Sequence, residues 1–162
     1  DGRWVPVAKD IIKHFNLKPG DKVLDVGAAK GFLVKDLLAE GIDAYGADVS
    51  EYALLNCEPE VVGRLQIGSA EKLPFPDGSF DAVLAINTIH NLPRKLCINA
   101  VNEIERLAPG KGFIQVDSYL SEEGKALFES WALTAVCYGR PSEWKSLFRE
   151  GGYTGDWYWT IL

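Results

Sequence analysis

Short apolar runs alternate with amphipathic segments along this chain of 162 residues. The run at residues 22–26, for example, lies between Pro19-Gly20-Asp21 and Gly27, which are turn-forming residues. Connections of about a dozen or more residues between such runs are typical of parallel strands joined by helical crossovers. The predicted strands are 22–26, 43–47, 64–67, 81–86, 113–116 and 156–162, and the predicted helices are 30–40, 50–55, 93–108, 121–136 and 141–150.

This alternation predicts a doubly wound, three-layer α/β sandwich with a mostly parallel sheet. Right-handed crossovers favour the strand order 3-2-1-4-5, with the last strand added at the edge beside the fifth. We expect one domain over residues 1–162, made of an N-terminal helical segment (1–20), a ligand-binding core (21–118) and an aromatic-rich C-terminal part (119–162). Sheets of this kind bind ligands beyond the carboxyl ends of their strands, so we expect the functional residues there.

Composition and charge narrow the class of protein. The chain is 47% hydrophobic and 25% charged, as in ordinary globular domains, and its net charge of -6 argues against nucleic-acid binding driven by phosphate neutralisation. No apolar run reaches the roughly 18–20 residues that cross a bilayer. The three cysteines lack CxxC or Cys/His spacing, which predicts a reducing, cytoplasmic compartment and no bound metal. The chain starts at Asp1 and contains no methionine, which is typical of a trimmed chain or a fragment.

The first predicted strand runs into the segment Asp25-Val26-Gly27-Ala28-Ala29-Lys30-Gly31, which opens a helix. Glycine lets the backbone turn sharply and approach a ligand closely at such a position. The dinucleotide pattern G-x-G-x-x-G fails, because Ala29 and Phe32 stand where glycine is required, and the P-loop pattern fails too. The spacing that fits is D-x-G-x-x-x-G. Asp48 ends the second strand, where its carboxylate can accept hydrogen bonds from ribose hydroxyls or, alternatively, serve a helix N-terminus near Ser50.

Residues 68–81 read G-S-A-E-K-L-P-F-P-D-G-S-F-D. Together with D-x-G-x-x-x-G, this segment resembles the class I S-adenosylmethionine-dependent methyltransferases, which place it around the adenine ring. The match runs from about Gly20 to Phe113, with alanine at position 29, where the family often has glycine, and serine at position 69, where an acidic residue is usual. The resemblance implies a Rossmann-like fold and S-adenosylmethionine as the cofactor, leaving S-adenosylhomocysteine as the product. The cofactor-binding residues that it implies are Asp25, Gly27, Ala28, Gly31, Asp48, Val49, Ser69, Ala70, Glu71 and Asn87.

Three further residues end the fourth and fifth strands, on the side where the resemblance places the methyl acceptor. His90 is the candidate general base, although such a residue also serves as a structural hydrogen-bonding group. Asp117 can orient the acceptor or cap the following helix, and Tyr119 follows it. We expect these three side chains to converge around the transferred methyl group. Trp131 and Tyr138 are expected to form the far wall, whereas most other C-terminal aromatics are expected to build a core.

The resemblance implies in-line transfer of a methyl group to a small molecule. The alternative hypothesis is a non-catalytic S-adenosylmethionine-binding module or a piece of a larger enzyme. A nicotinamide-dependent reductase is disfavoured by the failed glycine pattern. The fourth strand is not followed by Asn-Pro-Pro-Tyr and the chain has no Pro-Cys nucleophile, so methylation of nucleic-acid bases is not expected. The expected partners are the small-molecule acceptor and a second copy of the chain, joined through the aromatic C-terminal edge, with no membrane contact.

Overall fold

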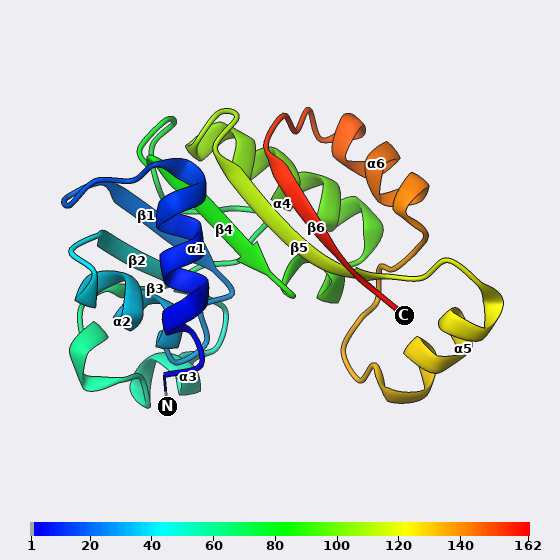
Figure 1. Ribbon diagram of the computed structural model, residues 1–162, viewed down its shortest axis with the longest axis horizontal. Helices are drawn as coiled ribbons and strands as arrows, with labels where there is room; N and C mark the ends of the chain where they lie inside the picture. Colours follow the sequence, from blue (N-terminus) through cyan, green and yellow to red (C-terminus); the bar gives the residue numbers. More distant parts are fainter. Residues whose placement is uncertain (1) are drawn as a thin grey trace.

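Six parallel strands form a single sheet in the computed structural model, which describes residues 2–162 (Figure 1). Their order is β3-β2-β1-β4-β5-β6. The prediction that the first and fourth strands are neighbours, and that the last strand lies beside the fifth, is confirmed. The strands are β1 (Lys22–Val26), β2 (Asp43–Asp48), β3 (Leu65–Ile67), β4 (Ala82–Ile86), β5 (Gly112–Ser118) and β6 (Asp156–Ile161).

Helices cover the sheet on both sides and connect successive strands. Ser50 and Ser121 cap two of them, since each side chain accepts a hydrogen bond from a backbone N–H in the first turn. No helix within residues 2–162 is long and apolar enough to cross a membrane. The helices are α1 (Val5–Phe15), α2 (Phe32–Ala39), α3 (Glu51–Leu55), α4 (Arg94–Leu107), α5 (Glu122–Trp131) and α6 (Pro141–Glu150), with short 3-10 turns η1 (Pro59–Val61) and η2 (Ile89–Asn91).

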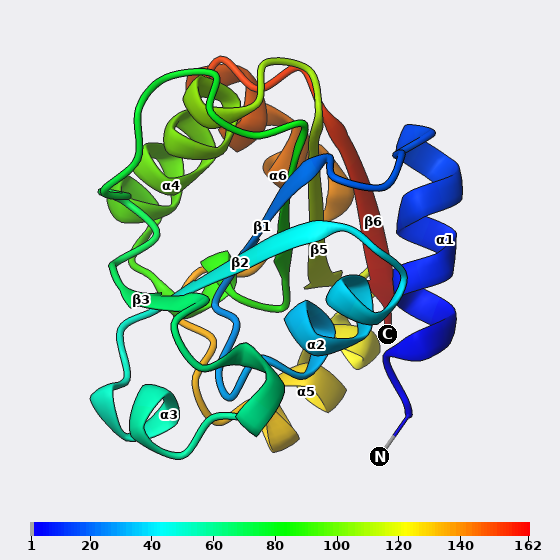
Figure 2. The ribbon, with the colours of Figure 1, turned by 90° about the vertical axis from the view of Figure 1, so that its left-hand side faces the viewer.

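Alternating side chains of the strands feed two hydrophobic clusters. Val23 of β1 packs with α1 and α2 on one face, whereas Leu24 packs with α4 and α6 on the other. Figure 2 shows the same division, with α1 and α2 on one side of the sheet and α4 and α6 on the opposite side. Because both faces are covered near the centre, β1 and β4 are buried almost throughout.

The helix predicted at residues 121–136 is shorter than expected. It ends at Trp131 rather than at residue 136. Ala132 leaves the helical conformation, and the chain continues as an irregular segment, residues 132–140, toward α6. The N–H groups of Val136 and Cys137 both donate to the carbonyl oxygen of His90, at 2.8 and 2.9 Å. A long-range acceptor therefore takes backbone donors that a longer helix would have used internally.

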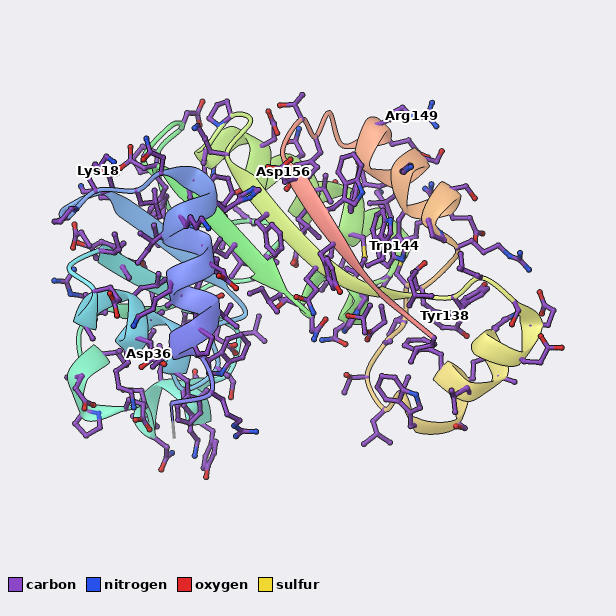
Figure 3. The ribbon with its side chains drawn as sticks, in the orientation of Figure 1. Lys18, Asp36, Tyr138, Trp144, Arg149 and Asp156 are labelled. Atoms are coloured by element: carbon purple, nitrogen blue, oxygen red, sulfur yellow. The ribbon has the colours of Figure 1, made fainter. Side chains whose placement is uncertain are left out.

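Part of the C-terminal aromatic group forms a core between α6 and the sheet, namely Trp144, Phe148, Tyr153 and Trp159. The expectation that most of the group builds a core is only partly met, since Trp131, Trp157 and Tyr158 are each more than 40% exposed. Trp144 is 2% exposed and extends from α6 toward the sheet, where its indole N–H donates to the carbonyl oxygen of Asp117 on β5 (Figure 3). Trp157 and Trp159 lie on one face of β6, and their rings stack at 5.9 Å. Phe148 contacts both rings, so this cluster fixes β6 against α6.

Candidate functional site

A cavity of about 300 Å³, which we call the strand-end cavity, lies at the carboxyl ends of β1, β2 and β4. From β1 the chain builds the sheet outward in one direction through β2 and β3, and then in the other direction from β4. The cavity therefore lies at the switch point, where the direction of strand addition reverses. Its lining is a mixture of glycine, polar and apolar residues: Gly27, Asp48, Val49, Gly68, Ser69, Ala70, Ile86, Asn87, Thr88, Asn91 and Leu92.

The loop after β1 forms one wall of this cavity, and glycine is required at its start. Gly27 has φ of 80°, and a Cβ placed on it would lie 2.2 Å from the hydroxyl oxygen of Thr88. The N–H groups of Gly27 and Ala28 both donate to the carbonyl oxygen of Ala47. Ala29, where glycine is common in the family, adopts the left-handed conformation with φ of 47°. The loop therefore wraps tightly and leaves room for a ligand beside Gly27.

Asp48 joins the first and second loops. Its Oδ2 accepts from the N–H of Ala29 and its Oδ1 accepts from the N–H of Ser50, each at 2.8 Å. Each carboxylate oxygen can accept more than one hydrogen bond, so both keep acceptor capacity toward the cavity. The carboxylate is thus oriented by the backbone before any ligand arrives.

The third wall is the turn after β3. The N–H of Gly68 donates to the carbonyl oxygen of Asp48 at 3.1 Å, and Ser69 pairs with Lys72 in a short antiparallel bridge. The Ser69 hydroxyl donates to the carboxylate of Glu71. Glu71 therefore places a carboxyl group next to Ser69, the position at which the resemblance noted in the sequence leads us to expect an acidic residue.

The loop at residues 73–80 is held in place by two residues of α4 that the sequence patterns did not single out. Glu103 accepts a hydrogen bond from the N–H of Leu73 at 2.8 Å. Arg106 donates to the carbonyl oxygens of Phe75 and Leu73, at 2.8 and 3.2 Å, and pairs with Glu103. This pairing lowers the pKa of Glu103 and raises the pKa of Arg106. A spacing of three residues on a helix predicts that Glu103 and Arg106 form an ion pair. It does not predict that the pair also binds the 73–80 loop.

Asp25 lies beneath the first loop, beside a second cavity of about 90 Å³ whose lining includes Trp4, Gly27, Ala28 and Ile86. Asp25 is 6% exposed. Burial first, and the negative charge of Asp48 second, raise the pKa of Asp25 to about 7. A buried carboxyl group with this pKa favours a cation, because a positive charge nearby stabilises its ionised form.

The structure brings most of the predicted cofactor-binding residues together. Six of them line the larger cavity, namely Gly27, Asp48, Val49, Ser69, Ala70 and Asn87. Asp25 and Ala28 line the smaller one. Gly31 lies under the loop, where an added Cβ would be 2.7 Å from Val61, and Glu71 contacts the cavity only through Ser69. Five further lining residues were not among the named cofactor-binding residues, although they lie in the segments 68–81 and 85–92 that the sequence pattern assigned to the site: Gly68, Ile86, Thr88, Asn91 and Leu92.

Of the predicted acceptor-side residues, His90 and Asp117 are close to each other, and none of the three lines either of these cavities. His90 is 6% exposed, and its Nδ1 lies 3.8 Å from the Asp117 carboxylate, with no hydrogen-bond partner among the described residues. Burial lowers the pKa of His90, and Asp117 opposes this effect. Tyr119 is buried, with the Arg140 guanidinium 5.8 Å from its ring. The catalytic roles of these residues stay predictions.

Trp131 and Tyr138, expected as a far wall, contact Phe128 instead, with ring centroids 5.5 and 4.9 Å from it. Neither residue lines the strand-end cavity. A different cavity of about 490 Å³ lies between α1 and the sheet face formed by Ile86, Phe113 and Tyr158. It is lined mainly by apolar side chains and lacks the strand-end loops. Residues 2–162 contain no group of three His, Cys, Asp or Glu side chains placed to hold a metal ion.

A family profile described as "Methyltransferase domain" matches residues 24–116, more than half of the chain. The matched region contains the first loop, Asp48, the 68–81 segment, the end of β4 and most of β5. The chain therefore belongs to the methyltransferase-domain family, within the class I S-adenosylmethionine-dependent methyltransferases.

Named relatives methylate small molecules according to their descriptions. Demethylmenaquinone methyltransferase of Symbiobacterium thermophilum is 31% identical over 131 residues, which cover 72% of this chain and 50% of the relative. Ubiquinone/menaquinone biosynthesis C-methyltransferase of Burkholderia mallei is 34% identical over 113 residues, covering 65% of this chain and 46% of the relative. The chain spans about half the length of these relatives.

Solved structures show the same fold. The YcgJ protein from Bacillus subtilis superimposes with a TM-score of 0.75 and 21% sequence identity, covering 93% of this chain and 68% of that one. The likeness extends beyond the profile match, since it covers 93% of this chain whereas the profile matches residues 24–116.

Proposed function

We propose that this chain binds S-adenosylmethionine in the strand-end cavity and in the smaller cavity beside Asp25, and that it transfers the methyl group to a small-molecule acceptor. The observation that carries the proposal is the pair of acidic residues around one glycine loop. Asp25 is buried beneath the loop, and Asp48 is oriented at its rim by two backbone N–H groups. A ligand with a cationic end and a neutral diol fits these two groups, whereas a pyrophosphate, which is anionic, does not.

The residues present fit the parts of this cofactor. The Asp25 carboxylate offers a counter-charge for the cationic methionine end, and the loop at Gly27 leaves space beside it. Asp48 keeps acceptor capacity for ribose hydroxyls. Ser69 and the N–H of Ala70 offer polar groups to the adenine edge, and Asn87 closes the floor after β4.

When bound, S-adenosylmethionine supplies a methyl group on a sulfonium, whose leaving group is already activated. The work of the chain is therefore alignment and exclusion of water. Buried β1 carries Asp25 and leads into the glycine loop, backbone N–H groups orient Asp48 at the end of β2, and the Glu103–Arg106 pair anchors the 73–80 loop. A base is needed only where the acceptor must lose a proton, and His90, with Asp117 and Tyr119, is our proposal for that side.

The named relatives act on quinone precursors and, for the sterol 24-C-methyltransferase of Gibberella zeae, which is 31% identical over 66% of this chain, on a sterol. We extend this to an apolar small molecule as the acceptor class for this chain.

We also propose a cytoplasmic location and a homodimer through β6, an edge strand on which Trp157, Tyr158 and Ile161 are each more than 40% exposed. Sedimentation of the wild type and Tyr158→Lys tests the dimer, which the lysine is expected to weaken.

A second candidate function is binding of the cofactor without methyl transfer. The observation in its favour is that His90, Asp117 and Tyr119 line neither the strand-end cavity nor the smaller cavity beside Asp25. Calorimetric titration with S-adenosylmethionine, S-adenosylhomocysteine and NAD tests cofactor choice, and we expect heat only with the first two. Release of S-adenosylhomocysteine in the presence of quinone and sterol acceptors then separates an enzyme from a binding module. Binding of NAD alone would contradict both functions.

A further inference from the structure

Two of the three cysteines meet behind the strand-end cavity. Cys97 of α4 is 0% exposed, and its sulfur contacts the carbonyl oxygens of Ile89 and Leu92. Cys137, in the segment 132–140, is bound to the same turn through its N–H, and the two thiols interact. Cys137 is half-buried and lines a separate cavity of about 110 Å³ together with Arg94 and Glu143. Cys57, the third cysteine, packs against the opposite hydrophobic cluster, beside α2. All three are free thiols.

The surroundings give the two paired thiols different reactivities. The hydrogen bond from Cys97, followed by the positive charge of Arg94, lowers the pKa of Cys137, although burial opposes this. The same hydrogen bond and burial raise the pKa of Cys97. Cys137 is half-buried and lines a cavity, whereas Cys97 is 0% exposed, so a small disulfide reaches Cys137 first. Because the thiolate is the reactive form, the lowered pKa of Cys137 agrees with this order of attack. Arg94 also pairs with Glu150, which holds its guanidinium in place.

Both cysteines are attached to the same 3-10 turn, η2, which borders the strand-end cavity. The Cys97 sulfur lies 2.8 Å from the carbonyl oxygen of Ile89 and 3.2 Å from that of Leu92. The N–H of Cys137 donates to the carbonyl oxygen of His90 at 2.9 Å. Leu92, at the end of this turn, lines the cavity, as does Asn91 within it. A change at the Cys97 sulfur, or a shift of the Cys137 backbone, therefore acts on a wall of the proposed cofactor site.

We propose that Cys97 and Cys137 form an oxidation site that reacts with a low-molecular-weight disulfide, closes to an intramolecular disulfide and thereby weakens cofactor binding. The Cys137 thiolate attacks the small disulfide, forming a mixed disulfide and releasing one small thiolate. Cys97 then attacks the Cys137 sulfur, its proton passing to solvent or to the released thiolate, and the second small thiol leaves. Two protein thiols are oxidised to one disulfide, and one small disulfide is reduced to two thiols.

The weakening follows from the lost Cys97 proton. Cys97 has one S–H proton, and the carbonyl oxygens of Ile89 and Leu92 are the backbone acceptors within reach of it. Once oxidised, the Cys97 sulfur has no proton to donate, so the Leu92 carbonyl oxygen loses this donor and the Ile89 carbonyl oxygen keeps only the N–H of Leu92, at 3.1 Å. The turn is then expected to shift, together with the lining residues Asn91 and Leu92. This part of the inference rests on the proposed function.

The test is incubation of the chain with oxidised glutathione, followed by peptide mass mapping and calorimetric titration of the reduced and oxidised forms with S-adenosylhomocysteine. We expect a Cys97–Cys137 link, a mass lower by two hydrogens, and affinity about fivefold weaker after oxidation, the effect of disturbing one weak hydrogen bond. Reduction with dithiothreitol is expected to restore the affinity. Cys57→Ser is the matched control and is expected to behave as the wild type.

Two variants keep the outcome decisive. Cys97→Ser keeps a hydroxyl donor and is expected to stop at a Cys137–glutathione mixed disulfide, whereas Cys137→Ala is expected to leave Cys97 unmodified because it is fully buried. Preferential modification of Cys57, absence of the Cys97–Cys137 link, or an unchanged affinity in the linked form would overturn the inference. If the reduced chain does not bind S-adenosylhomocysteine, the proposed function and the coupling both fail, while the mapped link still decides the thiol chemistry.

Discussion

Asp25 gives the stability of this chain a specific pH dependence. Its pKa is raised to about 7, from an ordinary value of 3.8, by burial and by the charge of Asp48. Between these two values the folded chain keeps a proton that the unfolded chain has lost. The stabilising contribution is therefore complete below about pH 4 and is lost as the pH rises through about 7. At 1.36 kcal/mol per pKa unit, the interval corresponds to roughly 4 kcal/mol in the free energy of unfolding.

The substitution Asp25→Asn removes this loss, because the amide has nearly the same shape and does not ionise. At about pH 8 the variant is expected to exceed the wild type in free energy of unfolding by up to roughly 4 kcal/mol, and at about pH 4 the two are expected to be similar. Urea unfolding followed by tryptophan fluorescence across this range measures the difference. Asp10→Asn, which changes an exposed carboxylate of α1, is the control. A difference that does not change with pH, or a variant less stable at about pH 8, would refute the reasoning.

Three further substitutions probe the site. Asp48→Ala is expected to weaken S-adenosylhomocysteine binding by on the order of 2–3 kcal/mol in calorimetry, through two charge-assisted hydrogen bonds, and unchanged affinity would remove Asp48 from the ribose site. Arg106→Ala is expected to lower the free energy of unfolding by about 1–3 kcal/mol and to speed hydrogen exchange at Leu73 and Phe75, because their loop loses its anchor; equal exchange rates would show that the loop holds itself. His90→Ala is expected to lower turnover by ~10²–10⁴-fold with cofactor affinity nearly unchanged, whereas loss of stability alone would assign His90 a packing role.

The order of the strands in the sheet was predictable for two reasons. Strand and helix periodicities are visible in the local sequence, and crossovers between parallel strands are almost always right-handed. Residues 22–26 are short, apolar and bounded by turn residues, and β1 is found there. The end of α5 was not predictable in the same way. Nothing within residues 121–136 shows that Val136 and Cys137 will donate to the carbonyl oxygen of His90, which lies far away in sequence.

The candidate site divides similarly. Asp25, Gly27 and Asp48 sit in a motif or at a strand end, so their positions followed from the sequence. The contact of Thr88 with Gly27 could not be predicted in this way. Thr88 fills the space that the missing side chain of Gly27 leaves open, and the two residues are far apart in sequence. The burial of His90 beneath residues 132–140 is likewise a tertiary effect, since the segment that covers it has no recognisable local pattern.

The most direct test of the proposed function is a crystal structure of the chain with S-adenosylhomocysteine. We predict density in the strand-end cavity, with the ribose hydroxyls within hydrogen-bond distance of Asp48, the adenine beside Ser69 and Ala70, and the amino-acid end beside Gly27 above Asp25. Density for the ligand in the cavity between α1 and the sheet, with the strand-end cavity filled only by water, would contradict this function.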